Sequence, residues 1–329
     1  MLIHQEERLP LLYISLMALC GILGFNSCDE QQSFEAALIR VDTAAVSSIL
    51  INPKGKHPGI TFKREGKIWI ASRGNISVRA LPDPVNQLLN SLSLIKTDYL
   101  AANQADTWEE YGVTQTNSTR VRVFQNENLL EDFLIGRFSA SEAERNAVSY
   151  LRLAGEDEVY AVNGFQALPF TRHFNSYRNP LLLSLKPERF LIRLDYHRAD
   201  TVFSFIPKGE QRQGKSLLAV DSAEIEAYFR KLHRVEGHFF ADRFDEMQAG
   251  ALPRRSLVLH SADDSVTVTL YRDSTRDDRP FILYSSQYPD TFFASDSTGL
   301  YKEIFAQPER WIQSENGIQH IQSSQRSPH

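Results

Sequence analysis

Apolar and polar residues alternate along most of the chain after residue 45, and this period of two predicts β-strands. The first alternating runs are residues 46–52, 59–64 and 67–71, which short polar or glycine-containing stretches separate. The chain also holds 20 Phe and 12 Tyr, residue types that favour strands. We expect four later strands in this half, at residues 119–124, 129–135, 148–153 and 159–162.

A second set of alternating runs follows in the other half of the chain. It begins with RFLIRLDY at residues 189–196 and continues at residues 201–206 and 216–220. The later members are residues 256–260, 266–272, 281–285 and 292–294.

Each half also contains one segment with helical spacing of its apolar residues. The first begins at Pro82, Asp83 and Pro84, and its apolar positions are Val85, Leu88, Leu89, Leu92 and Ile95. In the second, Asp221 and Ser222 supply the cap of a helix through Ile225, Tyr228, Phe229 and Leu232.

Strands and helix follow in the same order in both halves, which predicts an α+β fold of two tandem related units. Each unit is expected to be an antiparallel sheet packed with one main helix. The predicted units span residues 40–168 and 188–312, and residues 169–187 connect them. The polar residues 313–329 are predicted to be a disordered tail. A single continuous sheet with two helices is the alternative.

The first 28 residues form an apolar leader that ends at a cysteine. Arg8 precedes an apolar run at residues 9–25, and Cys28 is followed at once by Asp29 and Glu30. This leader resembles a bacterial lipoprotein signal peptide, in which the cysteine receives the lipid and becomes the N-terminus. The run is short for a membrane-spanning helix, which needs about 20 residues. An uncleaved N-terminal helix and an ordinary secretory signal are the alternatives.

A lipid such as palmitate on Cys28 places the protein in the cell envelope, tethered to a membrane and facing the periplasm or the surface. Cys20 lies within the leader and leaves with it, so the mature chain forms no disulfide. The chain carries 36 basic and 41 acidic residues without a basic block. This balance predicts no nucleic-acid partner, because phosphate binding needs clustered Lys and Arg.

One phosphate-binding pattern occurs, GEQRQGKS at residues 209–216. A phosphate cradle requires its Lys and Ser to begin a helix. Here SLLAV follows, and the corresponding place in the first half is a turn between two strands. We therefore predict a hairpin at Gly214 and no nucleotide or other cofactor.

The remaining candidates for chemistry do not form a recognisable catalytic or metal motif. His233 and His238 are five residues apart, which is off the spacing that places two ligands on one helix face. The acidic pairs are expected in turns or on an exposed helix. The other histidines, which lie far apart in the sequence, are His57, His173, His197 and His260, and the acidic pairs are Glu109/Glu110, Asp263/Asp264 and Asp277/Asp278. The sequence thus predicts no catalytic and no metal site.

Asp followed by Ser or Thr recurs along the chain and resembles an O-glycosylation motif of one bacterial phylum. The same dipeptides are common in turns and helix caps, which is the structural alternative. The candidate glycosylation sites are Thr43, Thr201, Ser222, Ser265, Ser274 and Ser297.

Several short blocks resemble the domain of unknown function numbered 4340, over roughly residues 46–206. The blocks are TDYLAANQADTWEEYGV (97–113), RVRVF (120–124), FLIGRF (133–138), AVSYLRL (147–153) and EVYAVN (158–163), together with Trp69. This family occurs in bacterial envelope proteins, and some members resemble accessory parts of gliding-motility-type ABC transporters. The resemblance implies no catalytic residue. The leader of this chain departs from members that are anchored by a full transmembrane helix.

From these features we expect a non-enzymatic cell-envelope lipoprotein that acts as a tethered binding or scaffold module. Its partners would be the membrane, through the lipid, and envelope proteins. One alternative is an accessory subunit of a gliding-motility-type ABC transport system. A second alternative is a hydrolase of envelope polymers, which would need carboxylates that converge in a cleft.

Overall fold

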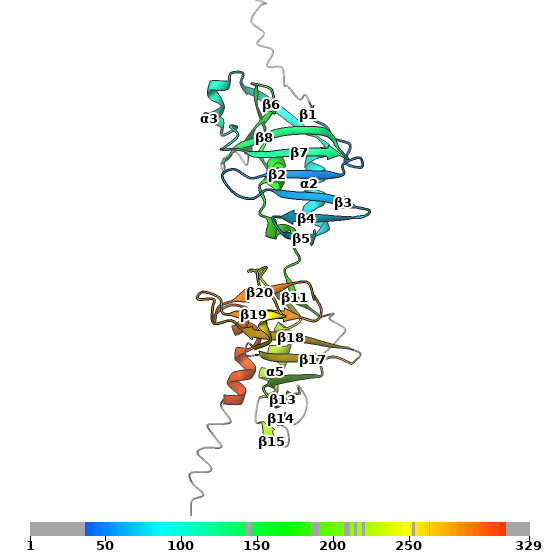
Figure 1. Cartoon of the computed structure of the whole chain (residues 1–329), viewed down its shortest axis with the longest axis vertical. Helices are drawn as coiled ribbons and strands as arrows, with labels where there is room; N and C mark the ends of the chain where they lie inside the picture. The colour runs from blue at the N-terminus through cyan, green and yellow to red at the C-terminus, as the bar shows by residue number, and fades with distance from the viewer. Residues whose placement is uncertain are drawn as a thin grey trace, which may run out of the picture. The chain divides into compact units, whose positions relative to one another are not determined.

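The computed structural model describes residues 37–141, 146–185, 191–206, 211–213, 216–218, 221–251, 254–262 and 264–313. The chain divides into two compact units, Met1–Arg178 and Asn179–His329 (Figure 1). Antiparallel sheets dominate and helices pack on them, so the fold class is α+β. The leader with Cys28, and residues 314–329 of the predicted tail, lie outside the described residues.

The first unit is built on one antiparallel sheet. Its strands are β1 Ala37–Ile39, β2 Ser48–Asn52, β3 Ile60–Glu65, β4 Ile68–Arg73, β5 Ile76–Arg79, β6 Ile95–Ala102, β7 Thr119–Gln125, β8 Asn128–Ser141, β9 Asn146–Leu153 and β10 Val159–Asn163. The sheet order is β1-β6-β10-β9-β8-β7-β2-β3-β4-β5. The expected strands of this half are present, and β1, β5 and β6 are additional.

Helix α2 (Pro82–Ser93) begins at the predicted proline, because a proline in the first turn loses no hydrogen bond. Its apolar stripe, Val85, Leu88 and Leu92, is buried in the same core as the strands. The prediction that Ile95 belongs to this helix is wrong. Leu94 is extended, with φ −163° and ψ 115°, and Ile95 is the first residue of β6.

Short helices complete the first unit. They are η1 Ala105–Thr107, α3 Trp108–Tyr111, α4 Gly164–Ala167, η2 Leu168–Thr171 and η3 Phe174–Tyr177. The segment from α4 to η3 buries Phe170, Phe174 and Tyr177 in the core of this unit, where Tyr177 packs edge-on against Phe62 with ring centroids 4.6 Å apart. The first part of the predicted connector therefore packs within the first unit.

The second unit has an eight-stranded antiparallel sheet and a separate pair of strands. The strands are β11 Leu181–Ser184, β12 Arg193–Arg198, β13 Thr201–Phe205, β14 Gln211–Gln213, β15 Ser216–Leu218, β16 Arg234–Glu236, β17 Arg254–His260, β18 Ser265–Arg272, β19 Phe281–Ser285 and β20 Phe292–Ser295. The large sheet has the order β15-β14-β13-β12-β17-β18-β19-β20, and β11 pairs with β16.

Helix α5 (Ser222–Lys231) begins as expected, because the side chain of Asp221 accepts a hydrogen bond from the backbone N–H of Ala223. The 3-10 helix η4 (Gln248–Ala251) precedes β17, and α6 (Leu300–Ile304) follows β20. A further helix covers residues 306–313, so Gln313, the first residue of the predicted tail, is helical. The core of this unit is formed by side chains of the sheet and side chains of these helices.

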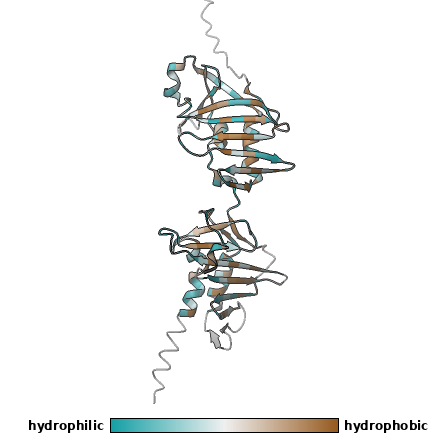
Figure 2. Cartoon of the chain, in the orientation of Figure 1, coloured by the Kyte–Doolittle hydropathy of each residue, from teal (hydrophilic) through white to brown (hydrophobic). Residues whose placement is uncertain are grey.

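Figure 2 shows apolar and polar residues mixed along the strands of each unit, as sheets with one buried face require. In the first unit the buried set includes Ile49, Ile51 and Phe62 on neighbouring strands. In the described residues, no helix has the length and apolar character needed to cross a membrane.

Candidate functional site

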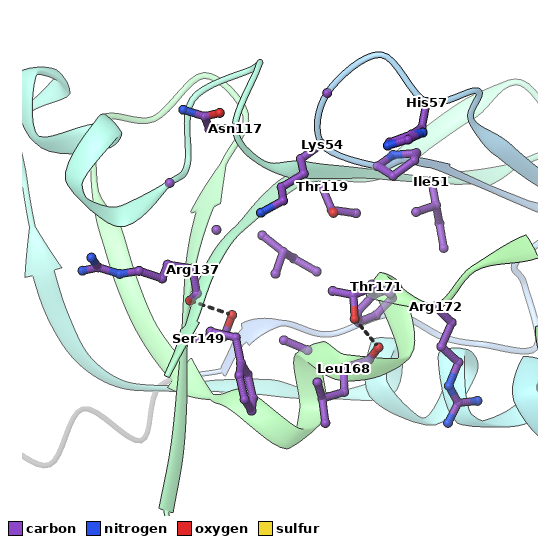
Figure 3. Close-up of a pocket in the computed structure, with 18 of the residues that line it drawn as sticks. Ile51, Lys54, His57, Asn117, Thr119, Arg137, Ser149, Leu168, Thr171 and Arg172 are labelled. Atoms are coloured by element: carbon purple, nitrogen blue, oxygen red, sulfur yellow. Dashed lines mark hydrogen bonds between the residues drawn. The ribbon is translucent and has the colours of Figure 1, made fainter. Parts of the chain in front are cut away.

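The first unit contains a pocket with a volume of about 1020 Å³. Ligand pockets commonly reach about 1,000 Å³, so this cavity has room for an organic molecule. Its lining comes from segments that are far apart in the sequence, between Ile51 and Phe174. Figure 3 shows the lining side chains grouped around this space.

Apolar side chains form the floor of the pocket. Ile51, Ile60 and Ile135 project from three strands, and Phe170 and Phe174 come from the segment between α4 and η3. Each of the five is at most 4 % exposed. Two hydroxyl-bearing residues, Thr119 on β7 and Ser149 on β9, line the same space (Figure 3).

A β-bulge in β8 shapes one wall. Ile135 pairs with Leu151 and Phe138 pairs with Ser149, so Gly136 and Arg137 together face a single residue of β9. The bulge shifts the alternation of β8 by one residue, and Phe138 consequently lines the pocket. Gly136 has no room for a side chain, because a Cβ at this position would lie 2.2 Å from the backbone oxygen of Tyr111.

The loop between β2 and β3 forms the rim above the floor. Gly55 has a φ of +81°, which glycine adopts without strain, and its N–H donates a 3.1 Å hydrogen bond to the carbonyl of Thr116. This bond joins the loop to the segment before β7. Lys54 and His57 lie on the loop, and Figure 3 shows Lys54 pointing into the pocket.

Cations outnumber anions around the pocket. Lys54, Arg73, Arg137 and Arg172 line it, and among the residues that the structure describes none of these four forms an ion pair. The guanidinium carbon of Arg73 lies 4.8 Å from the ring centroid of Phe174. The guanidinium groups of Arg137 and Arg172 point away from the centre in Figure 3, which leaves Lys54 as the central cation.

Two glutamates also line the pocket, both on the exposed helix α3. Asn117 donates a hydrogen bond to the carboxylate of Glu109. Glu110 is the next residue after Glu109 and also lines the pocket. The acidic pair predicted on an exposed helix thus faces the pocket mouth. Burial raises the pKa of three other carboxyl groups, those of Asp98, Glu131 and Glu303, and all three lie outside the pocket.

The second unit places a Ser, an Asp and a His together on its sheet. Asp195 accepts a 2.8 Å hydrogen bond from Ser204, and its other oxygen lies 2.9 Å from Nε2 of His260. Arg193 forms an ion pair with the same carboxylate at 3.0 Å. A catalytic triad needs the histidine between serine and carboxylate. Here the carboxylate is in the middle and Ser204 donates to it directly, so the three residues do not have the geometry of a catalytic triad.

The pocket unites two of the histidines considered as metal ligands. His57 and His173 both line it, whereas His197 and His260 lie in the second unit. In the part of the chain that the structure describes, no group of three or more His, Cys, Asp or Glu side chains could hold a metal ion.

The phosphate-binding pattern at residues 209–216 has the geometry of a strand pair where it is described. Strands β14 and β15 are antiparallel, and Gln213 faces Ser216. Ser216 therefore begins a strand and not a helix, so its backbone does not present a helix N-terminus to a phosphate. Gly214 and Lys215 themselves lie outside the described residues.

The candidate glycosylation sites lie mostly on the surface. Thr201, Ser265, Ser274 and Ser297 are exposed and Thr43 is half-buried, while the side chain of Ser222 lies outside the description. The preceding aspartates have structural roles at four of the six positions. Asp42, Asp221, Asp273 and Asp296 each accept a hydrogen bond from the backbone N–H two residues ahead.

No curated protein matches the chain significantly. No solved structure does so either. A family model described as Domain of unknown function (DUF4340) matches residues 69–247, which is more than half of the chain. The match starts in β4 and ends beyond β16, so it includes parts of both units. The chain therefore belongs to the family described as Domain of unknown function (DUF4340).

Proposed function

We propose that this protein is a non-enzymatic cell-envelope lipoprotein that acts as a tethered binding or scaffold module. A lipid on Cys28 would hold the chain at a membrane, and its two units would face the periplasm or the surface. The observation that carries the binding role is the open pocket of the first unit, with its apolar floor and a central Lys54 that forms no ion pair with any described residue.

Two hydroxyl groups of the pocket, those of Ser149 and Thr171, support binding over catalysis. Ser149 donates to the carbonyl of Arg137 at 3.4 Å, and Thr171 donates to the carbonyl of Leu168 at 2.9 Å (Figure 3). A nucleophilic hydroxyl requires a general base within hydrogen-bond reach. Both hydroxyls contact backbone oxygens, which cannot take up a proton in this way.

We also propose that the two units are tandem copies of one ancestral unit. In the first sheet the order β10-β9-β8-β7-β2-β3-β4-β5 is the same as β20-β19-β18-β17-β12-β13-β14-β15 in the second, with every number raised by ten. The pairs β1–β6 and β11–β16 correspond in the same way. Helices α2 and α5 both follow the last strand of this order.

Two alternatives to the binding module have different support. An accessory role in an ABC transport system rests on the family membership alone, and genes for an ATPase and a permease beside this one would favour it. A polymer hydrolase would need a carboxyl group with a raised pKa in the pocket. Among the residues that the structure describes, the carboxyl groups with raised pKa values are those of Asp98, Glu131 and Glu303, and they lie outside the pocket.

The anchor is tested by labelling the full chain with radioactive palmitate in bacteria. Wild type and a Cys20→Ala variant should be labelled equally, because Cys20 leaves with the leader. A Cys28→Ala variant should remain unlabelled. Equal labelling of Cys28→Ala, or no labelling of the wild type, would contradict the anchor.

The binding role is tested by photo-crosslinking in living cells. A benzophenone amino acid replaces Leu168, which lines the pocket and is 39 % exposed, or Phe239, which is 52 % exposed in the second unit. Mass spectrometry of the purified chain should find a discrete adduct at position 168 that is absent at position 239. The absence of any adduct at position 168 would refute a ligand-binding role for the pocket.

A further inference from the structure

We infer that the pocket of the first unit binds an amphiphilic anion. Lys54 and Thr119 would hold its acidic head group, and its apolar body would lie on the floor of Ile51, Ile135 and Phe170. This inference rests on the binding function proposed above and names the chemical class of the ligand.

Lys54 and Thr119 together offer unused hydrogen-bond donors. The Lys54 ammonium points into the pocket and has no acidic partner in the described structure. Thr119 is only 8 % exposed, yet its hydroxyl has no hydrogen-bond partner among the described residues, and it faces the same space. An ammonium and a hydroxyl are suitable donors for a carboxylate or phosphate, and such charge-assisted hydrogen bonds are stronger than neutral ones.

The apolar part of the ligand is indicated by the floor and the mouth of the pocket. The floor side chains come from three strands and from the segment between α4 and η3, and all of them are apolar. Two large apolar residues at the mouth are partly exposed, Phe138 to 41 % and Leu168 to 39 %. A ligand that covered them would remove this apolar surface from water.

In the second unit, the strand position that matches Thr119 is occupied by a residue that binds a carboxylate of the same unit. The inward residues of β7 are Val123, Val121 and Thr119, and those of β17 are Leu259, Leu257 and Arg255. Arg255 donates to the carboxylate of Glu309. If the units are tandem copies, the position of Thr119 corresponds to a site where the other unit already holds a carboxylate.

The residues of the pocket argue against two other kinds of anion, a long polyanion and a small inorganic anion. A long polyanion would bring repeated negative charge close to Glu109 and Glu110 at the mouth, which costs electrostatic energy. A small inorganic anion would leave the exposed apolar side chains of Phe138 and Leu168 in contact with water. A ligand with a single acidic group on an apolar body brings little negative charge near the two glutamates and also covers apolar surface.

The inference is tested by calorimetric titration of the full chain in phosphatidylcholine nanodiscs, with empty nanodiscs as the blank. The probes are octyl phosphate, inorganic phosphate and octyltrimethylammonium. Octyl phosphate should bind at least about tenfold more tightly than either of the other two. Equal binding of octyltrimethylammonium would overturn the anionic head group, and equal binding of inorganic phosphate would overturn the apolar body.

Variants of the pocket sharpen the test. Lys54→Gln should weaken octyl phosphate binding about tenfold, because a charge-assisted hydrogen bond is lost. Thr119→Val keeps the shape and should weaken binding by about threefold. Lys56→Gln is the matched control, because Lys56 lies on the same loop but does not line the pocket. Equal affinities of Lys54→Gln and Lys56→Gln would overturn the proposed head-group site.

The source of the anion is distinguished by competition. Displacement of octyl phosphate by nanodiscs that contain phosphatidic acid would support a membrane lipid as the ligand, and binding without such displacement would support a diffusible amphiphile. The failure of this inference differs from that of the proposed function. An adduct at position 168 without octyl phosphate binding would leave the binding role intact and overturn only the ligand class.

Discussion

The hydroxyl of Tyr196 donates a 2.9 Å hydrogen bond to the carboxylate of Glu309. Arg255 donates to the same oxygen, and Tyr301 donates to the other oxygen at 2.8 Å. Glu309 lies on the helix of residues 306–313, whereas Tyr196 and Arg255 lie on neighbouring strands of the second sheet. This one carboxylate therefore holds the last described helix against the sheet.

Replacing Glu309 with Gln should lower the free energy of unfolding of the second unit by about 2 kcal/mol, because Arg255 loses an anionic partner and a charged hydrogen bond. Urea unfolding, followed by the fluorescence of Trp311, measures this change. Trp311 is 4 % exposed and lies in the core of this unit. The measurement uses a background in which Trp69 and Trp108 are replaced by Phe.

Arg310→Gln is the matched control for this prediction. Arg310 is the next residue on the same helix, and its side chain is exposed. Its replacement should change the unfolding free energy by less than about 0.5 kcal/mol. Similar losses in both variants would mean that Glu309 contributes only through helix propensity.

Arg152 should be essential for the position of α3 in the first unit. Its guanidinium lies 3.7 Å from the ring centroid of Trp108 and donates to the carbonyls of Val113 and Glu156, while the residue is only 5 % exposed. Arg152→Ala should lower the unfolding free energy by about 3 kcal/mol and increase amide hydrogen exchange in α3. The exposed Arg79→Ala serves as control. Unchanged exchange in α3 with Arg152→Ala would contradict this role.

The strands and both main helices were predictable because their signals are local. Alternation over five to eight residues identified strands such as β7, and the Pro82 and Asp221 signals placed the starts of α2 and α5. The helix at residues 306–313 was not predicted, because Pro308 and three polar residues interrupt the apolar pattern. In the structure Pro308 lies in the first turn of that helix, where proline is tolerated.

The pocket was not predictable as a whole, since its walls meet only after folding. One local signal was present: Thr119 and Ser149 are polar residues in the inward phase of their strands. The position of Phe138 was not predictable, because regular alternation places it on the outward face. The bulge at Gly136 shifts the strand by one residue and moves Phe138 to the inward face.

Gly136→Ala should distort the pocket and destabilise the first unit. The added Cβ would lie 2.2 Å from the carbonyl oxygen of Tyr111, so the strand or the segment after α3 must move. We expect a loss of about 3 kcal/mol in urea unfolding. Gly66→Ala is the control, because its site has open space and only its φ of +61° opposes a side chain. That variant should lose only about 1 kcal/mol.

The second unit should lose stability as the pH rises above 10, and Tyr271 accounts for part of this loss. Burial, and a hydrogen bond to Glu246, raise the pKa of Tyr271 to about 12 from the usual 10.0. Above pH 10 the unfolded chain releases this proton while the folded chain keeps it, so the unfolding free energy falls with rising pH until about 12.

Urea unfolding between pH 10 and 11.5, followed by Trp311 fluorescence, tests the contribution of Tyr271. In the Tyr271→Phe variant the slope of unfolding free energy against pH should be smaller by up to about 0.8 proton near pH 11, which corresponds to about 1.1 kcal/mol per pH unit. Glu246→Gln should reduce the slope by less, because it removes the charged acceptor and leaves the burial in place. If Tyr271→Phe shows the wild-type slope, Tyr271 ionises equally in the folded and unfolded chains, and burial by Phe244 and its neighbours does not protect the hydroxyl.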